Sequence, residues 1–388
     1  MKKMKLQDVC ELFTDGDWIE SKDQSDEGIR LVQTGNIGIG KYLEKEGKEK
    51  YISKDTFKSL NCTEIYPGDV LISRLPEPVG RGCIIPEKNE RMITAVDCTI
   101  CRVNEKIVDK KYFCYYLQSP TYYNQLEQSV TGTTRKRISR KNLGNVEMSI
   151  PEKEKQIEII NVLDKVTTLI EERKEELQKL DELIKARFVE LFGDVQREEK
   201  YPGIPLRKLC STISGGTPST KYPEYYKGDI PWISTVSLGP NHIDGSTAKG
   251  YITEEAIVNS ATKLIPAGNI LFGTRVGVGK SSLNDVDICT NQDIVAIVGI
   301  DETKYSRLFI KHVLDAYQPY FDSIKKGATI LGITGEDLKD SLIPEVPIEL
   351  QKEYENFVEQ VDKSKVAVQK ALEEAQLLFD SLMQKYFG

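Results

Sequence analysis

The chain has 388 residues, of which 39% are hydrophobic and 29% are charged, and its formal net charge is −7 at pH 7. This length exceeds the roughly 100 to 200 residues of an ordinary domain, so at least two cores are expected. The composition is that of a globular chain, and no run approaches the roughly 18 apolar residues that a membrane helix needs, which excludes a membrane protein.

The N-terminal stretch MKKMKLQDVCELF has basic residues but no apolar run before the first acids, so we expect no signal peptide and a cytoplasmic location. The eight cysteines are scattered and are expected to be reduced thiols. Only Cys98 and Cys101 form a CxxC pair, and the chain has just two histidines, which disfavours a zinc site.

The sequence contains an internal repeat. The stretch YISKDTFKSLNCTEIYPGDVLIS, residues 51–73, matches YITEEAIVNSATKLIPAGNILFG, residues 251–273. Each predicts a short polar helix, a Pro/Gly turn and an apolar strand. IRLVQTGNIG similarly matches IPWISTVSLG. Such self-similarity predicts two repeated α+β domains.

A basic stretch, TGTTRKRISRKNL, covers residues 131–143 and contains no acid. Its repeat partner is KGATILGITGEDL, and the shared frame consists of Gly132, Ile138 and Leu143 against Gly327, Ile333 and Leu338. Glycine and aliphatic residues at fixed spacing suit a turn and a buried strand, whereas the charged filling differs. A variable filling on a fixed frame indicates recognition, although an exposed, solvated loop is the alternative.

Comparison of the two repeats argues against a metal site and against a phosphate-binding loop. Cys98 and Cys101 align with Ile294 and Ile297, which are ordinary positions of a buried strand, so we expect core thiols. GTRVGVGKSS resembles a phosphate-binding loop, but five residues separate Gly273 from Gly279 where the motif requires four. GTRVGVGKSS and its counterpart in the first repeat, LISRLPEPVGRGC, are therefore interpreted as glycine-bearing hairpins.

Long helices are predicted after Pro151 and after Pro347, because both segments lack internal Gly and Pro and carry apolar residues at alternating spacings of four and three. Each could extend for about 60 Å at about 1.5 Å per residue. The narrow stripe favours an antiparallel pair within the chain. The predicted interface residues are Ile159, Leu163, Val166, Ile170, Leu177, Leu180, Ile184, Leu191, Val358, Val361, Val368, Leu372, Phe379 and Leu382.

Residues 151–193 contain 8 basic and 11 acidic residues, and residues 347–388 contain 5 and 8. Most of the negative charge thus lies on the helices. The globular parts are nearly neutral, which permits a local nucleic-acid surface and argues against indiscriminate binding.

The order of domain, long helix, domain, long helix resembles the specificity (S) subunit of type I restriction-modification enzymes. The junctions LGNVEMSIPEKEKQ and SLIPEVPIELQ, and the pair ISGGTPST and DIPWIS, carry the resemblance, although FTDGDWIES replaces the glycine-threonine-proline turn in the first copy. It implies recognition domains at residues 1–150 and 196–346, with spacer helices at residues 151–195 and 347–388.

The resemblance implies a non-catalytic reader of double-stranded DNA, in which each domain recognises half of a split target and the helices act as a ruler. Methylation (M) subunits and restriction/motor (R) subunits are the implied partners. S-adenosylmethionine, ATP and Mg²⁺ would belong to those partners, and no cofactor is expected on this chain. The residues agree, because the chain has neither a Pro-Pro nor an Asn-Pro dipeptide with which to hold a flipped adenine.

We expect the DNA contacts to come from basic side chains near the repeated hairpins, since Arg and Lys bind phosphates and Arg also pairs with guanine. The candidates are Arg135, Lys136, Arg137, Arg140, Lys141, Arg74 and Arg81 in the first domain, and Lys221, Tyr222, Arg275, Lys280, Lys325 and Lys326 in the second. Tyr222, Tyr225 and Tyr226 could instead cover a core edge, and Trp232 is expected in a strand core.

Three alternatives stay open at this point. The chain could serve a fused methyltransferase-nuclease instead of separate subunits. It could be a coiled-coil scaffold whose globular ends bind proteins, although that leaves the basic filling without a role. An independent enzyme is the third, and it is disfavoured by the absent motifs.

Overall fold

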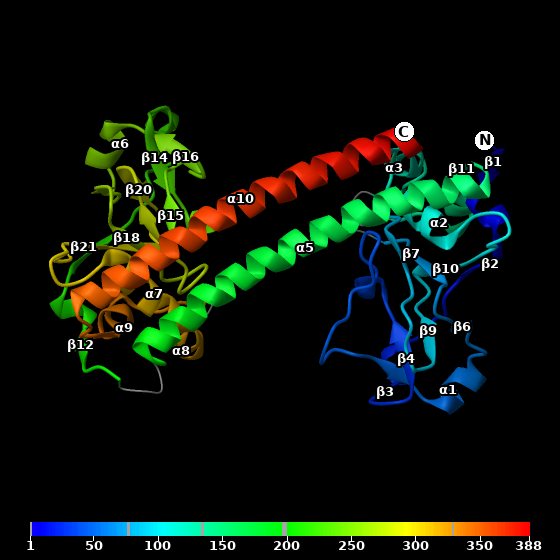
Figure 1. The fold of residues 1–388 in the computed structure, drawn as a ribbon, viewed down its shortest axis with the longest axis horizontal. Coiled ribbons are helices and arrows are strands. Elements are labelled where there is room, and N and C mark those ends of the chain that lie inside the picture. Colours follow the sequence, from blue (N-terminus) through cyan, green and yellow to red (C-terminus); the bar gives the residue numbers. More distant parts are fainter. Residues whose placement is uncertain (1, 76–77, 133–135, 196–199, 328–329) are drawn as a thin grey trace. The chain divides into compact units, whose positions relative to one another are not determined.

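The structure is a computed structural model that describes residues 2–75, 78–132, 136–195, 200–327 and 330–388. The chain forms two compact units (Figure 1). Unit 1 comprises residues 1–175 and 369–388, and unit 2 comprises residues 176–368. Both long helices therefore contribute one end to each unit. No helix of the described residues is long and apolar enough to cross a membrane.

Unit 1 is built in layers from two main sheets. The first sheet has the order β2 (Cys10–Asp15), β10 (Cys98–Val103), β7 (Val70–Ser73), β8 (Gly82–Ile84). The second has the order β3 (Gln24–Ser25), β5 (Tyr51–Ile52), β4 (Ile29–Val32), β9 (Met92–Thr94), β6 (Glu64–Ile65). A small antiparallel pair joins β1 (Lys2–Lys5) to β11 (Glu147–Ile150). The helices are α1 (Lys54–Ser59), α2 (Lys110–Tyr116), α3 (Pro120–Glu127), α4 (Arg140–Gly144) and the start of α5 (Lys153–Phe192).

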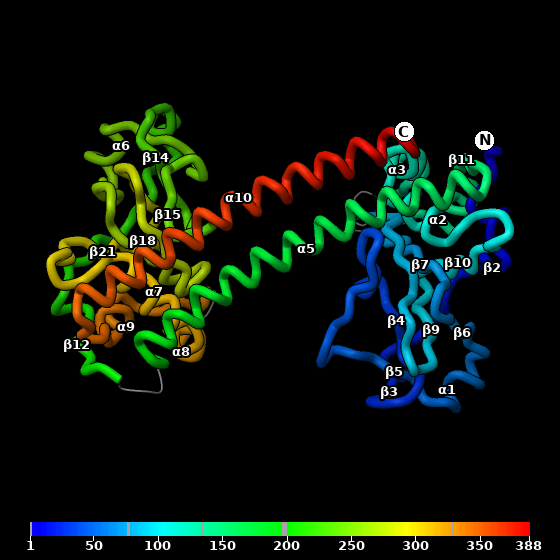
Figure 2. The backbone as a smooth tube through the Cα atoms, in the orientation of Figure 1, coloured from blue at the N-terminus to red at the C-terminus, as the bar shows by residue number. Residues whose placement is uncertain are grey.

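The first sheet lies between the helices and the second sheet. Successive side chains along its strands point alternately to these two neighbours. Val70 and Ile72 of β7 pack with the helices, whereas Leu71 packs with the second sheet. Both faces are buried, so these strands are apolar on both sides. Each fully buried aliphatic side chain contributes about 1.5–3 kcal/mol to stability. The backbone trace shows β4 and β9 on the far side of β7 and β10 from α5 (Figure 2).

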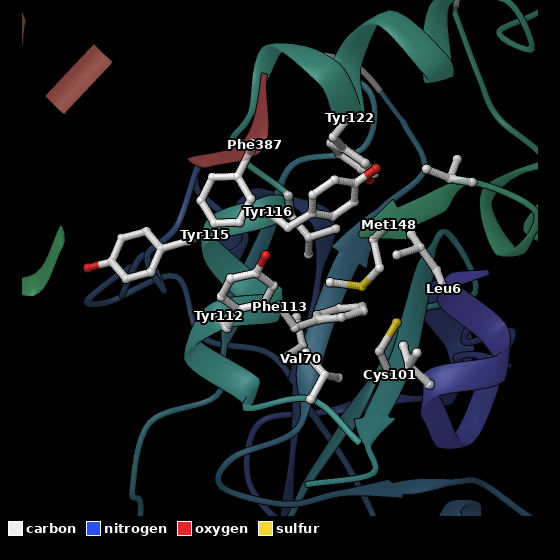
Figure 3. Packing of buried hydrophobic residues seen from close by; sticks show 14 of the residues in the cluster. Leu6, Val70, Cys101, Tyr112, Phe113, Tyr115, Tyr116, Tyr122, Met148 and Phe387 are labelled. Carbon is white, nitrogen blue, oxygen red and sulfur yellow. The ribbon is translucent and has the colours of Figure 1, made fainter. Parts of the chain in front are cut away.

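The helical layer of unit 1 is closed by the last residues of the chain. Phe387, at the end of α10 (Ile348–Phe387), packs its ring 5.1 Å from that of Tyr112 and 6.2 Å from that of Tyr116. Both tyrosines come from α2, and Figure 3 shows the three rings gathered over Phe113 and Met148. The C-terminal turn is therefore part of the core of unit 1.

Unit 2 repeats this plan, with β15 (His242–Ile243) added to its first sheet and no counterpart of β3 in its second. Its first sheet is β13 (Ser211–Ser214), β21 (Ile294–Val298), β18 (Ile270–Gly273), β19 (Ser281–Asn284), β15 (His242–Ile243). Its second is β16 (Gly250–Ile252), β14 (Ile230–Ile233), β20 (Ile288–Thr290), β17 (Leu264–Ile265), and β12 (Gly203–Pro205) pairs with β22 (Leu342–Pro344). The helices are α6 (Glu254–Val258), α7 (Arg307–Ala316), α8 (Gln318–Ile324), α9 (Gly335–Lys339) and the start of α10.

The repeat predicted from the sequence is confirmed. The helices α1 and α6 and the strands β7 and β18 occupy equivalent places, and the same strand pair, β4 with β9 and β14 with β20, is parallel in both units. The α+β class, with two repeated domains and two long helices, is therefore correct. GTRVGVGKSS forms the β18–β19 hairpin, as expected.

The two cysteines of the CxxC pair lie in strand β10 and are core thiols, as expected. Cys98 packs with the second sheet, whereas Cys101 packs with the helices, so their side chains point to opposite faces. Burial raises the pKa of the Cys98 thiol to about 12, and burial also raises the pKa of the Cys101 thiol. Because the two thiols lie on opposite faces, they cannot bind one metal ion together.

The long helices run antiparallel in each unit. In unit 1, Ile159 and Leu163 near the start of α5 pack with Phe387, whereas Ile170, further along α5, packs with Ala375. In unit 2, Ile184 of α5 packs with Val358 of α10. Every interface residue predicted from the sequence is buried or half-buried. The predicted interface did not include four further residues of these helices that are buried against the globular parts: Phe188, Phe192, Met383 and Phe387.

Charged residues that interrupt the apolar stripe bridge the two helices. In unit 2, Arg187 of α5 lies 2.7 Å from Glu353 of α10, and Lys365 of α10 lies 2.7 Å from Asp181 of α5. Both bridges are partly exposed, so each is worth about 0–1 kcal/mol. Their greater effect is to favour one axial register of the pair.

A buried glutamine anchors the start of each long helix. In unit 2, Gln351 accepts a hydrogen bond from the Ser306 N–H at 2.8 Å and donates to the carbonyls of Val346 and Lys304 at 2.7 and 3.1 Å. In unit 1, Gln156 accepts from the Asp109 N–H at 2.7 Å and donates to two carbonyls in the same way. Ser306 and Asp109 are the N-cap residues of α7 and α2. Each glutamine thus ties a long helix to a domain helix.

Candidate nucleic-acid interface

Two equivalent hairpins carry the sequence stretch singled out for recognition. In unit 1, Thr131 and Arg137 exchange backbone hydrogen bonds of 2.9 Å, and in unit 2 Lys326 and Gly332 exchange bonds of 2.8 and 3.0 Å. The next residue is then bound to the strand layer: the N–H of Ile138 donates to the Arg74 carbonyl, and that of Ile333 to the Thr274 carbonyl. Residues 133–135 and 328–329, including Arg135, lie outside the described residues.

The frame behind the hairpins is the same in both units. Ser139 and Thr334 cap the short helices α4 and α9, and their side chains accept from the N–H three residues later. Leu143 and Leu338 are fully buried beneath these helices. The predicted frame of glycine and buried aliphatic residues is therefore repeated in both units.

The basic residues of the unit 1 hairpin are exposed. The Arg137 side chain is 50% exposed and lies 2.9 Å from Asp97, and Arg140 lies 3.8 Å from Asp15. Lys136 and Lys141 are exposed and make no ion pair within the described part of the chain. Surface ion pairs are worth only about 0–1 kcal/mol, so a phosphate could replace these carboxylates. The four cations are available to an external anion.

Arg74 and Arg81 differ from what the sequence suggested, because they are buried. Arg74 is 4% exposed, donates to the Val96 carbonyl at 2.6 Å, and lies 3.2 Å from Asp15. Arg81 is 9% exposed and donates to the carbonyls of four residues, Ile37, Thr34, Leu75 and Pro78. Backbone carbonyls occupy these guanidinium groups, so they brace the loops and are not placed for direct DNA contact.

The basic candidates of unit 2 are spread more widely. Arg275 is exposed and lies 3.8 Å from Asp293, while Lys280 and Lys326 are exposed. Lys325 forms an ion pair with Asp322. Next to them the hairpin presents apolar side chains that the sequence reasoning missed: Ile330 and Leu331 are 54% and 58% exposed. Apolar residues of this kind can contact thymine methyl groups or wedge against bases.

The aromatic segment of unit 2 divides into an exposed and a buried part. Lys221 and Tyr222 are exposed, and the Tyr222 ring lies 5.1 Å from that of buried Tyr225. Trp232 is in the strand core, as expected, and its Nε1 donates to the Gly216 carbonyl at 3.0 Å. Lys221 and Tyr222, the two candidates of this segment, are therefore accessible for contact with a base or phosphate.

A family model covers nearly the whole chain. The model described as "Type I restriction modification DNA specificity domain" matches residues 1–181 and 200–377, one match for each repeat. Among curated proteins, the specificity subunit of the type I restriction enzyme EcoR124I/EcoR124II of Escherichia coli is 28% identical over 276 residues. That alignment covers 68% of this chain and 65% of the E. coli subunit, slightly less than two thirds of its length.

Solved structures share the fold. A chain from a structural study of complex assembly and conformational transition in the type I R-M system superposes with a TM-score of 0.56 at 18% identity, over 99% of this chain and 96% of that chain. The type I restriction-modification S subunit from M. genitalium gives a TM-score of 0.54 at 14% identity, over 100% and 96% of the two chains.

Proposed function

Because the chain belongs to the family of type I restriction-modification DNA specificity proteins, we propose that it is the DNA-reading subunit of such a system. Each unit reads one half of a split target. The subunit itself performs no chemistry, and methylation and cleavage reside in its partners.

The observation that supports this proposal is the pair of hairpins on one frame. The backbone pairing of the hairpin is the same in both units, whereas its side chains are basic in unit 1 and largely apolar in unit 2. We take this combination as the mark of two loops that bind different ligands on one scaffold. Base edges in the major groove differ in donors, acceptors and methyl groups, so two different fillings suit two different half-sites.

Methylation subunits and restriction/motor subunits are the proposed protein partners. Both long helices keep apolar side chains exposed beside the buried stripe, including Leu183 and Val189 in unit 2 and Leu377 and Leu378 in unit 1. Such residues on a helix suit docking of a partner. In this scheme S-adenosylmethionine, ATP and Mg²⁺ bind to the partners and none binds to this chain, and the complex works in the cytoplasm.

The deciding experiment is modified-base sequencing of the host genome with and without this protein. Loss of a single two-part methyladenine motif on removal of the protein is expected, and it would identify both half-sites. An unchanged methylation pattern in a host that expresses the protein together with its methylation subunits would contradict the proposal.

The unit 1 hairpin can be tested separately by the salt dependence of DNA binding. The variant Lys136→Ala/Lys141→Ala is expected to reduce the slope of log K against log salt by about 1.8, since each lost phosphate contact removes about 0.9. Lys54→Ala/Lys58→Ala removes the same charge from exposed positions of α1 and is the matched control. Equal slopes for the two variants would exclude phosphate contacts by Lys136 and Lys141.

A further inference from the structure

A polar cavity in unit 1, separate from the hairpin, is lined by cations. It has a volume of about 300 Å³ and lies between strand β4, the turn that follows it, and the lysine-rich loop before β5. Four of its lining residues are basic and none is acidic: Arg30, Lys45, Lys48 and Lys50, together with Leu31, Gln33, Thr34, Gly35 and Asn36.

Arg30 forms the buried wall of this cavity. The residue is 2% exposed, its Nη2 lies 3.1 Å from Glu44 Oε1, and its guanidinium lies 5.5 Å from the centre of the Tyr51 ring. Its Nε and Nη1 are buried and have no hydrogen-bond partner among the described residues. Buried donors of a charged group are costly to leave unpaired, so they call for an acceptor.

The nearby carboxylates do not neutralise the lysines of this cavity. Glu44 pairs with Arg30 and with Lys88, and Lys88 Nζ also lies 3.7 Å from Glu90 Oε1, so these two carboxylates serve Arg30 and Lys88. Lys45 and Lys48 make no ion pair within the described ranges, and Lys50 Nζ donates to the neutral Gln24 Oε1 at 2.8 Å. The cavity therefore keeps an excess of positive charge.

Gly35 allows one of these cations to approach the cavity closely. A Cβ atom added at this position would collide with the Nζ of Lys45. The ammonium thus lies directly against the backbone of the turn, in space that a side chain would fill. In unit 2 the matching positions hold Pro231 instead of Arg30 and Val236 instead of Gly35. The frame of the fold does not need the basic cavity, because the other repeat is built without it.

We propose that this cavity binds one phosphate group. A guanidinium with free donors and several ammonium groups suits the oxygens of a tetrahedral anion, and Arg is the preferred partner for such groups. The phosphate can come from the backbone of a DNA strand, which rests on the proposed function, or from free inorganic phosphate. Only unit 1 would carry this contact, which makes the two halves unequal in their grip on a target.

The site can be tested on the full chain with inorganic phosphate alone, by calorimetric titration at constant ionic strength. Lys45→Ala/Lys48→Ala is expected to weaken phosphate binding at least tenfold, and Lys54→Ala/Lys58→Ala to leave it unchanged. Gly35→Ala keeps every charge but displaces the Lys45 ammonium, so it should also weaken binding. These variants leave Arg30 in place, so a folding defect in the strand does not complicate the result.

A second arm uses a long random-sequence duplex and distinguishes the sources of phosphate. If the DNA backbone supplies the group, Lys45→Ala/Lys48→Ala reduces the salt slope by about 0.9 relative to the control variant. If the slopes are equal while phosphate binding is lost, free phosphate is the ligand. No phosphate binding by the wild type, together with equal slopes, would overturn the site. Failure of the wild type to bind any DNA would instead refute the proposed function, and the phosphate titration would still decide on the cavity.

Discussion

The buried glutamine at the start of α10 offers the sharpest test of how the long helices are attached. Gln351 is fully buried and makes three hydrogen bonds. Gln351→Leu keeps much of the volume but leaves one N–H and two carbonyls of the core without this partner. Each buried group left unpaired costs about 1–3 kcal/mol, so we take the lower end for the three groups and expect unit 2 to lose at least about 3 kcal/mol of unfolding free energy.

The chain provides its own probe for this measurement. It has two tryptophans, Trp18 in unit 1 and buried Trp232 in unit 2. In a Trp18→Phe background, urea unfolding followed by Trp232 fluorescence reports on unit 2. With a denaturant slope of about 2–3 kcal/mol per molar urea, the loss should lower the midpoint by at least about 1 M. Gln360→Leu, at an exposed position of α10, is the control. Equal midpoints for the two variants would refute the anchoring role.

Three further predictions concern other parts of the molecule. Burial, with Lys311 and Lys365 nearby, holds the pKa of the His312 imidazole well below its usual 6.5. The stability that this neutral histidine confers is therefore complete above pH 6.5 and is lost as pH falls below it, by up to about 1.4 kcal/mol per pH unit. His312→Gln should flatten the pH dependence of unit 2 unfolding, and an unchanged pH dependence in this variant would contradict the assignment. Deleting one heptad from both helices, residues 172–178 and 367–373, keeps Ile170 opposite Ala375 and Asp181 opposite Lys365. Such a deletion removes about 10 Å of helix and should shorten the spacer of the methylated motif, while either deletion alone should abolish methylation; an unchanged spacer would contradict the ruler role. Arg81→Leu should lower the stability of unit 1 by more than about 2 kcal/mol in calorimetry, because four carbonyls lose their donor, whereas Lys280→Leu at the equivalent exposed position should change stability by less than about 0.5 kcal/mol.

Repetition made most of the fold predictable from the sequence. The apolar runs around Val70 and Ile270 were identified as strands because each supported the other, and the cysteines of β10 were assigned to the core because their repeat partners are isoleucines. The helix interface was predictable because its alternating spacing places one stripe on one face. Phe188 and Phe387 escaped this reasoning because each helix also packs on a globular part, which widens the buried face beyond the stripe.

The candidate contacts were harder to predict, because a sequence does not show which basic side chains are buried. Arg74 and Arg81 look like their exposed neighbours until the carbonyls around them are known. Arg30 does not stand out in the sequence, because it lies in an otherwise apolar strand. The loop KYLEKEGKEK contains both lysine and glutamate, so the loop seems to have a balanced charge. Only the fold shows that the lysines face a cavity that no glutamate lines.

The place of Phe387 in the core of unit 1 has a consequence for biosynthesis. The residues that Phe387 covers, Tyr112 and Tyr116, leave the ribosome long before it does. At about 5–20 residues per second, translation of the intervening residues 176–368 takes about 10–40 s, and during that time the first-made unit has an uncovered aromatic surface. A chain that lacks Phe387 would leave that surface exposed permanently. Loss of residues around position 387 would thus appear as misfolding of a unit whose other residues were made much earlier.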